Sequence, residues 1–452
     1  MLNLHIKNIG ILNEVNVDIE GLTVLGAKND SGKSTISKVM GTSLLSINKY
    51  KDTFEDYLEE YMGSLVKSIC NTIENNLRDK KFNIKEVPET IREMLDDEGE
   101  IELFSTRAKF DLSFRKSKDE RVNEAIDTFR IILETFNDEI TDKDFKKIKS
   151  LINDLENSKK IEIEEITNQL ILEFFRETFP NNLVNFHYNE NAHITIKDND
   201  NKIFDLLFDN NENIEKCLIG NSSINNIAYI ESPQIIDNLN KYEASFTERF
   251  LRKKARVKHY GNQLEKMLMT KQETNLISDN KRKNQTNLLL NKIEKIINGE
   301  MIFNENREFV FQKGSFKIDT LNVATGIKSF SIIQLLIKNN WLDEDTLLII
   351  DEPEINLHPE WQVKYAEILV LLQKYLNVKL YINTHSSYML EAFDLYSKKY
   401  NIQSKTNFYL LENYSSEELK EELTPIFKQL NGAFTLLDKE KINNFMNNGD
   451  LE

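Results

Sequence analysis

The order of hydrophobic and polar residues predicts three β-strands at the start of the chain. Residues 2–6 and then 15–19 alternate between apolar and polar side chains, which is the spacing of a strand with one buried face. The apolar run over residues 22–25 ends at Gly26 and predicts a short buried strand. A helix is expected next, because apolar residues recur at helical spacing through residues 36–40.

From about Lys49 the pattern becomes long, charged and helical. Apolar residues recur there in alternating steps of four and three, at Val122, Ile126, Phe129, Leu133, Phe136 and Ile140. This heptad spacing predicts paired helices. The pair Val87-Pro88 interrupts the helical pattern, and residues 110–114 alternate like a strand. Two interpretations stay open, an ordinary helical domain whose apolar seam is its core and a protruding coiled-coil arm.

Short strand-like segments return from about Asn185, at residues 186–188, 194–196, 203–207 and 227–230. A helical stretch follows over about 239–298, with further strand-like segments at 309–311, 316–318, 347–350 and 380–382. The last two are uninterrupted apolar runs, typical of central strands covered on both faces. The pattern therefore predicts a mixed α/β core with a large, mostly helical insertion. Its expected segments are 1–48, 49–184, 185–237, 238–300 and 301–452.

Composition narrows the class of protein. The 452 residues include 58 Lys and Arg against 74 Asp and Glu, a formal net charge of −16, so any nucleic-acid contact needs a local basic patch. Cys70 and Cys217 are far apart and without metal-ligand spacing, which is typical of a reducing compartment. No run of about 18 apolar residues occurs, so we expect no membrane contact and a cytoplasmic location.

The segment that precedes the first long helix has the residues of a phosphate-binding loop. Such a loop needs inward-pointing backbone N–H groups, a helix N-terminus, a lysine and a hydroxyl for magnesium. Gly32 permits close backbone approach, Lys33 supplies charge, Ser34 offers its hydroxyl to Mg²⁺, and Thr35 opens the helix. Ala27 stands where these loops usually begin with glycine. The residues expected to contact ATP here are Asn29, Asp30, Ser31, Gly32, Lys33, Ser34 and Thr35.

Polar side chains follow the two central apolar runs near the other end of the chain. Asp351 and Glu352 come directly after residues 347–350. Asp351 is expected to hold Mg²⁺ through water, and Glu352 to orient and deprotonate the attacking water. His385 follows residues 380–382 and is expected to hydrogen-bond the γ-phosphate. The alternatives are carboxylates that merely end a strand and a histidine with a structural role.

Three motifs together resemble the ABC-type ATPases of the RecF/SMC/OLD group. They are residues 29–35, 351–359 and 384–386. The resemblance implies an ABC-type P-loop ATPase head, with a mixed sheet and flanking helices, that converts ATP and water to ADP and phosphate. It also implies that two heads enclose the nucleotides between them, so self-association as a dimer or higher oligomer is expected.

The same resemblance implies a signature loop that touches the γ-phosphate held by the other head. The signature serine of the family falls on Ala324, so Thr325 is expected to provide the hydroxyl. Gly326 and Lys328 are the other expected contacts, and Lys328 would add positive charge at the start of the helix. Gln234 matches the glutamine that links the metal to the helical lobe, with an ordinary surface glutamine as the alternative.

Residues 326–330 and 361–385 most resemble stand-alone ATPase subunits of bacterial phage-defence systems, of the Septu PtuA-like type. This implies regulation of a separate effector nuclease, of HNH or Toprim type. The segment after His385 is shorter than the nuclease domain of OLD-type proteins, so we expect no nuclease domain in the chain itself. Two alternatives are a DNA-clamping repair or chromosome-associated ATPase and a nucleotide-gated scaffold. The basic residues within 249–283 could contact DNA or RNA, or form a solvated helix face.

Overall fold

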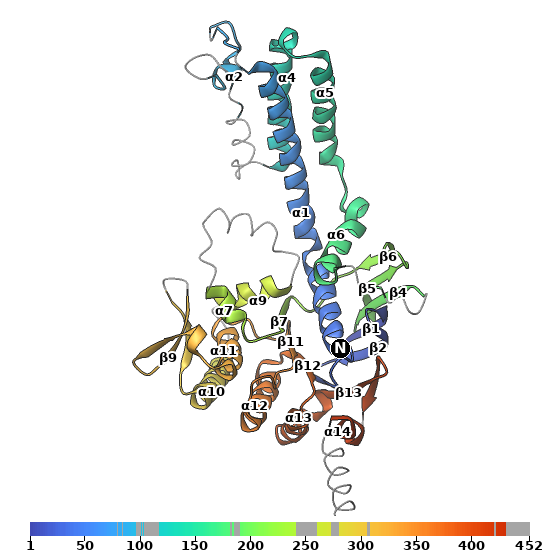
Figure 1. Cartoon of the computed structure of the whole chain (residues 1–452), viewed down its shortest axis with the longest axis vertical. Coiled ribbons are helices and arrows are strands. Elements are labelled where there is room, and N and C mark those ends of the chain that lie inside the picture. Colours follow the sequence, from blue (N-terminus) through green and yellow to red (C-terminus); the bar gives the residue numbers. More distant parts are fainter. Residues whose placement is uncertain are drawn as a thin grey trace, which may run out of the picture. The chain divides into compact units, whose positions relative to one another are not determined.

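The structure is a computed structural model (Figure 1). It describes residues 1–78, 80–83, 85–95, 101, 103, 117–180, 183–184, 190–240, 260–272, 280–304, 308–419 and 422–430. The chain divides into two compact units, one formed by Met1–Lys49 with Ile171–Glu452 and the other by Tyr50–Leu170. Two helices, α1 (Lys33–Leu77) and α6 (Ile163–Thr178), begin in one unit and end in the other.

An eleven-stranded sheet forms the centre of the first unit, in the order β6-β5-β4-β1-β2-β14-β13-β3-β12-β11-β7. The strands are β1 (Leu2–Ile9), β2 (Leu12–Ile19), β3 (Leu22–Gly26), β4 (Ala192–Asp198), β5 (Asn201–Phe208), β6 (Ile214–Ile219), β7 (Asn226–Ile230), β11 (Thr346–Asp351), β12 (Lys379–Thr384), β13 (Thr406–Glu412) and β14 (Ser415–Leu419). Strands β6, β5, β4, β1 and β2 pair antiparallel. Strands β13, β3, β12, β11 and β7 pair parallel.

The register of the parallel strands aligns their carboxyl ends. Gly26 lies opposite Thr384, and Asp351 lies opposite Asn383. On the next strand, Ile350 lies opposite Ile230, the last residue of β7. In open α/β sheets, ligands bind at this edge, beyond the carboxyl ends of the strands. The residues that follow β3, β7, β11 and β12 are therefore neighbours in space.

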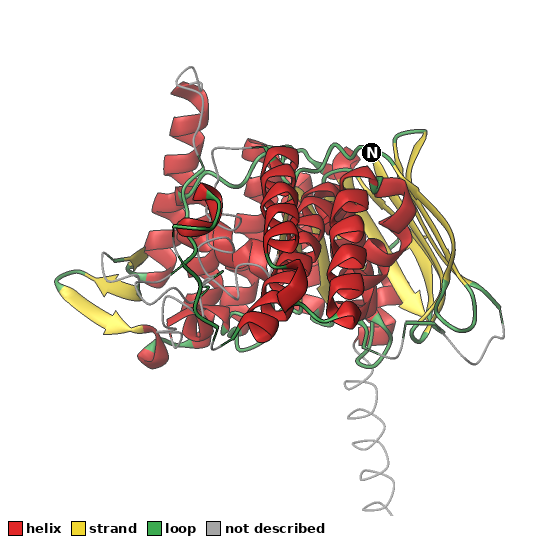
Figure 2. Ribbon diagram, turned by 90° about the horizontal axis from the view of Figure 1, so that it is seen from above, coloured by secondary structure: helices red, strands yellow, loops and turns green. Residues whose placement is uncertain are grey.

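Helices and a small sheet complete the first unit. The helices are α7 (Ile235–Asn240), α9 (Tyr260–Met269), α10 (Asn280–Ile297), α11 (Thr325–Lys338), α12 (Pro359–Leu376), α13 (Ser387–Lys399) and α14 (Thr424–Leu430). The small sheet has the order β10-β9-β8, from β8 (Glu300–Phe303), β9 (Phe309–Lys313) and β10 (Phe316–Asp319). Figure 2 shows this sheet and the antiparallel strands at opposite sides of the unit, with helices between them.

Helix α12 shows how local sequence sets the ends of a core helix. His358 caps its amino end, Pro359 occupies the first turn, and Asn377 ends it in the left-handed conformation with a φ of 53°. The helix buries nearly every residue from Tyr365 to Leu372. Phe330 of α11 packs edge-on against Tyr365, so the two helices share one core.

The second unit has its own apolar core, shared by α1, α4 (Lys118–Thr135) and α5 (Asp142–Asn157). Ser117 and Glu120 form a capping box at the start of α4. The heptad seam correctly predicted the buried face of α4, but the helix ends before Phe136 and Ile140. A short turn follows instead, because Thr141 caps the next helix through its side chain. The seam is therefore the core of several helices and not one long coiled-coil helix.

Most of the strands expected from the pattern are confirmed, namely those at 2–6, 15–19, 22–25, 194–196, 203–207, 227–230, 309–311, 316–318, 347–350 and 380–382. Strands β6, β8, β13 and β14 were not predicted. The expected strands at 110–114 and 186–188 lie outside the described residues. The division into five segments remains a prediction. In the part of the chain that the structure describes, no helix is long and apolar enough to cross a membrane.

A buried ion pair joins helices α7 and α11. The ammonium of Lys328 lies 2.6 Å from the carboxylate of Asp237, and its side chain is almost fully buried. Breaking such a pair leaves one charge buried without compensation. We expect Lys328→Met to lower the free energy of unfolding by about 3 kcal/mol, measured by urea denaturation. The control is Lys364→Met, which breaks an exposed pair with Glu360 and should cost less than about 1 kcal/mol. Equal losses in both variants would show that the Lys328 pair is solvated.

Candidate active site

The phosphate-binding loop lies between β3 and α1, at the carboxyl edge of the parallel strands. The amide N–H groups of Thr35 and Ile36 donate to the carbonyl of Gly32, which starts the helix. Gly32 itself has a φ of +96°, and a Cβ atom there would lie 2.6 Å from Leu12 Cδ2. Two constraints therefore require glycine at this position: the positive φ, and the lack of room for a Cβ atom beside Leu12. Asp30 also has a positive φ, of 59°.

The residues at the entry of the loop explain how Ala27 is accommodated. Ala27 is fully buried, and its N–H donates to the carbonyl of Thr384 on β12. The backbone approaches a neighbouring side chain closely one residue earlier. A Cβ atom at Gly26 would lie 2.5 Å from the Ile426 side chain on α14. Glycine at position 26 is therefore required by packing against α14, and Ala27 is tolerated in the buried position after it.

The Lys33 side chain is folded against the loop and is only 4% exposed. Its ammonium donates to the carbonyls of Ala27, at 3.2 Å, and Lys28, at 2.7 Å. The nearest carboxylate is Glu352, with Oε1 3.9 Å away. Burial lowers the pKa of Lys33, while the negative charges of Glu352, Glu354 and Asp351 oppose this shift.

The carboxylate of Asp351 is 7% exposed and accepts hydrogen bonds from three side chains. Oδ1 accepts from Ser37 at 2.5 Å and from Asn383 at 2.7 Å, and Oδ2 accepts from the hydroxyl of Tyr229 at 2.7 Å. The hydroxyl that touches Asp351 is thus that of Ser37, one turn along α1 from Ser34. The Ser34 side chain is exposed at the mouth of the loop.

Glu352 has a backbone conformation that is uncommon for a residue with a side chain. Its φ is 48°, in the left-handed region, and its N–H donates to the carbonyl of Asn383 at 2.9 Å. The side chain is 27% exposed. Its carboxylate lies 3.8 Å from the ring nitrogen Nδ1 of His385. The strand end therefore directs Glu352 toward Lys33 and His385.

His385 is held by Glu354, a residue to which we had assigned no role from the sequence. The backbone N–H of His385 donates to Glu354 Oε1 at 2.6 Å, and the ring Nδ1 lies 3.0 Å from the same oxygen. The contact with Glu354 raises the pKa of His385. The charge of Glu352 adds to this rise, and burial and Lys33 oppose it. The third carboxylate of the Asp351-Glu352-Pro353-Glu354 run was the signal available in the sequence.

The donor set of this edge fits a nucleotide with magnesium. The loop offers backbone N–H groups and Lys33 to phosphates, and Ser31 Oγ is buried there without a hydrogen-bond partner. Within the described ranges, no cluster of three His, Cys, Asp or Glu side chains could hold a metal ion by itself. Mg²⁺ binds commonly through one or two protein oxygens, water and substrate phosphates. Ser34 and Asp351 are the residues that would hold it.

Gln234 and the expected signature residues lie on other elements of the same unit. Gln234 is exposed in the turn between β7 and α7, at the carboxyl edge that also carries Asp351. Thr325 and Gly326 open α11, whose cap residue Ala324 makes no side-chain cap hydrogen bond. Lys328 differs from the expectation. Its ammonium is buried against Asp237 and does not add charge to the surface at the start of the helix, because the next turn of α11 faces the core.

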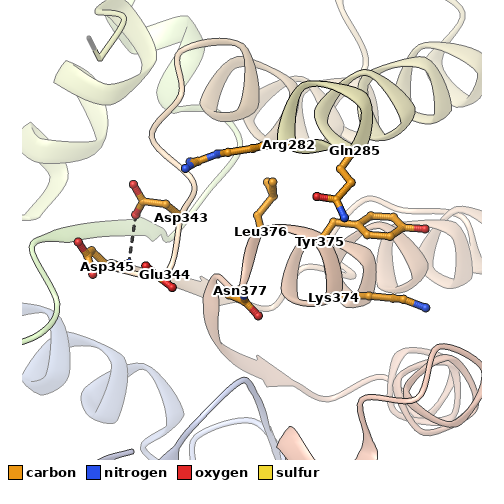
Figure 3. Close-up of a pocket in the computed structure, with 9 residues that line it drawn as sticks. All are labelled: Arg282, Gln285, Asp343, Glu344, Asp345, Lys374, Tyr375, Leu376 and Asn377. Atoms are coloured by element: carbon orange, nitrogen blue, oxygen red, sulfur yellow. Dashed lines mark hydrogen bonds between the residues drawn. The ribbon is translucent and has the colours of Figure 1, made fainter. Parts of the chain in front are cut away.

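A separate polar depression of about 520 Å³ lies at the opposite edge of the sheet (Figure 3). It is lined by Asp343 to Asp345, which precede β11, and by Asn377, which precedes β12. Arg282 lines the same depression and donates to the carbonyl of Leu342. The amino ends of the strands form this depression, so it is distinct from the site around Asp351. Of the expected basic surface, residues 249–258 lie outside the described residues.

Comparisons with known proteins found a matching family and similar solved structures. The AAA ATPase domain family matches the chain over residues 1–390. No curated protein sequence matches it. The SMC head domain from Thermotoga maritima is a similar solved structure, with 11% identity, 93% of this chain and 98% of that chain covered, and a TM-score of 0.33. An SMC head bound to the C-winged helix domain of ScpA has 10% identity, covers 94% and 98% of the two chains, and gives a TM-score of 0.39.

The sheet, the flanking helices and the loop between β3 and α1 confirm the expected α/β fold of a P-loop ATPase head with a large helical insertion. The family match extends from the first strand past His385 and so includes both halves of the site. Since it covers most of the sequence, the chain belongs to the AAA ATPase domain family.

Proposed function

We propose that this chain is an ABC-type ATPase that hydrolyses ATP to ADP and phosphate at the carboxyl edge of its parallel strands. The observation that carries the proposal is the meeting of Lys33, Asp351, Glu352 and His385 at that edge. Lys33 and His385 both lie within 4 Å of the Glu352 carboxylate. A site for phosphoryl transfer needs this combination of a phosphate cradle, a metal carboxylate and a group that orients water.

Each residue of the site has a distinct role in this proposal. The loop N–H groups and Lys33 bind the β- and γ-phosphates, and Ser34 and Asp351 hold Mg²⁺. Bound with ATP, Mg²⁺ would supply neutralisation of the charge that develops on the phosphate oxygens. Glu352 orients the attacking water and accepts its proton. His385, oriented by Glu354, donates a hydrogen bond to the γ-phosphate.

We also propose self-association through the start of α11. Ala324 is exposed and provides no side-chain cap, which leaves the first N–H groups of this 14-residue helix available to an anion. Thr325 adds a hydroxyl at the same place. A nucleotide held by a second copy of the chain would fit both features. Lys328 has no part in this contact, because it is paired with Asp237.

For the cellular role, we favour a phage-defence ATPase that regulates a separate nuclease. The support is the sequence resemblance of residues 326–330 and 361–385 to such subunits. A DNA-clamping role like that of SMC or RecF proteins is the second candidate, and the basic residues 249–258 favour it. Both roles use the same ATPase chemistry and differ in the partner.

The first prediction of this proposal concerns the proton acceptor. Glu352→Gln keeps the size of the side chain and removes its basicity, so we expect ATP turnover to fall by at least about 100-fold while ATP binding is retained. Gel filtration with ATP should show the variant enriched in an associated form. Glu360→Gln, an exposed carboxylate on α12, serves as the control. Normal turnover in Glu352→Gln would contradict the assigned role.

The second prediction concerns pH. Glu354 raises the pKa of His385, so the protonated ring persists to higher pH than usual and is lost as the pH rises through that pKa. Glu354→Gln removes the charge that causes the rise. We expect the alkaline limb of the kcat profile to move to lower pH in this variant. The profile of Glu360→Gln should not move. An unchanged limb in Glu354→Gln would show that His385 does not control it.

The third prediction separates the two cellular roles. A phage-defence subunit should co-purify with a nuclease from its native host. A DNA clamp should bind duplex DNA at low salt and lose affinity steeply as salt rises. In that case, replacing the Arg and Lys residues of 249–258 by Ala should weaken binding and reduce the salt dependence. Replacing Lys143, Lys146 and Lys147, which are exposed on α5, by Ala is the control for loss of positive charge elsewhere on the chain. Absence of any DNA binding would remove the clamp.

A further inference from the structure

The carboxylate of Asp351 is fixed by donors from three separate elements. Ser37 belongs to α1 and Asn383 to β12, and both donate to Oδ1. Tyr229 belongs to β7 and donates to Oδ2. Within the described part of the chain, no other side chain donates to Oδ2. The orientation of that oxygen therefore depends on Tyr229.

The position of Tyr229 makes this contact a rigid one. Strand β7 pairs in parallel with β11, and Tyr229 lies opposite Ile349, two residues before Asp351. The tyrosine ring is 2% exposed and bridges this offset toward the end of the neighbouring strand. A carboxylate that is hydrogen-bonded at one oxygen can still rotate about its Cβ–Cγ bond. A donor to the other oxygen fixes the plane of the carboxylate. The aromatic ring is itself fixed by packing, so it places the donor with little freedom.

A second buried tyrosine shows that burial alone does not give a tyrosine hydroxyl a hydrogen-bond partner in this core. Tyr381 lies on β12 and is fully buried, like Tyr229. Its hydroxyl has no hydrogen-bond partner among the described residues. The same core thus contains one buried tyrosine that contacts the carboxylate and one that lies near it without this bond. The pair offers a matched comparison on strands that both flank β11.

We propose that Tyr229 is a positioning residue for the magnesium carboxylate of this ATPase. This proposal rests on the proposed function, because it assumes that Asp351 holds Mg²⁺ with ATP. Tyr229 acts on the metal through the orientation of Asp351 and touches neither the nucleotide nor the metal. Side chains that orient metal ligands in this way commonly change metal affinity by about 10-fold or more when the hydrogen bond is lost. Strand β7 also leads directly into the turn that carries Gln234, so the metal carboxylate is joined to that turn through one strand.

The test is Tyr229→Phe, which keeps the ring and removes the donor. Binding of a fluorescent ATP analogue is measured first in EDTA and then during a Mg²⁺ titration. We expect the affinity without Mg²⁺ to equal that of the wild type, which also reports an intact fold. The Mg²⁺ concentration for half-maximal enhancement should rise by about 10-fold. Tyr381→Phe should change neither quantity.

A double variant shows whether the effect passes through Asp351. Asp351→Asn removes the charged ligand, so adding Tyr229→Phe to it should cause no further rise in the Mg²⁺ requirement. The proposal is overturned by a Tyr229→Phe titration that matches the wild type, by an equal shift in Tyr381→Phe, or by a full shift that persists with Asp351→Asn. Failure of the wild type to bind the ATP analogue under any condition would instead overturn the proposed function, and this inference with it.

Discussion

The amide of Asn383 joins the two halves of the site. Its nitrogen lies within 3.0 Å of the Lys33 carbonyl, the Ser37 hydroxyl and the Asp351 carboxylate. The carbonyl of the same residue accepts the N–H of Glu352. One residue at the end of β12 thus holds the first turn of α1 and the end of β11 in a fixed relation. The side chains of Ser37, Asp351 and Asn383 are buried, where an unpaired carboxylate would be costly, so these hydrogen bonds favour one arrangement of the site.

Three carboxylates surround the positive charge of Lys33 in the site. One buried ammonium lies among the carboxylates of Asp351, Glu352 and Glu354, and each of them favours its charged form. The ammonium bonds to loop carbonyls and lies 3.9 Å from the nearest carboxylate oxygen. A lysine held in this way lies beside the proposed phosphate position without a close ion pair that a ligand would have to break.

Sequence patterns predicted the strands and the charged residues of the site but not the residues that position them. Alternation identifies β1 and β2, where burial repeats at about every second residue, and buried-type runs identify β3, β11 and β12, which are covered on both faces. Lys33, Asp351 and Glu352 follow from motif chemistry. The roles of Tyr229, Ser37 and Glu354 depend on contacts between elements distant in sequence, and no local spacing encodes them. Lys328 shows the same limit, since its charge suggested a surface role until its buried partner on α7 was known.

The topology explains how the sheet tolerates the long separation in sequence between the phosphate-binding loop and the Asp351-Glu352 motif. Strand β3, which carries the phosphate loop, is flanked by β12 and β13, and both come from the last quarter of the sequence. The loop strand therefore has no partners on either side until the end of the chain has folded. Such long-range pairing slows folding, but its entropic cost grows only with the logarithm of the intervening length, at about 0.6 kcal/mol for each doubling. The insertion Tyr50–Leu170 has its own apolar core, so once folded it shortens the flexible part of the segment between β3 and β12. The sheet can thus keep its register at Gly26, Asn383 and Asp351 while a large unit is interposed in sequence.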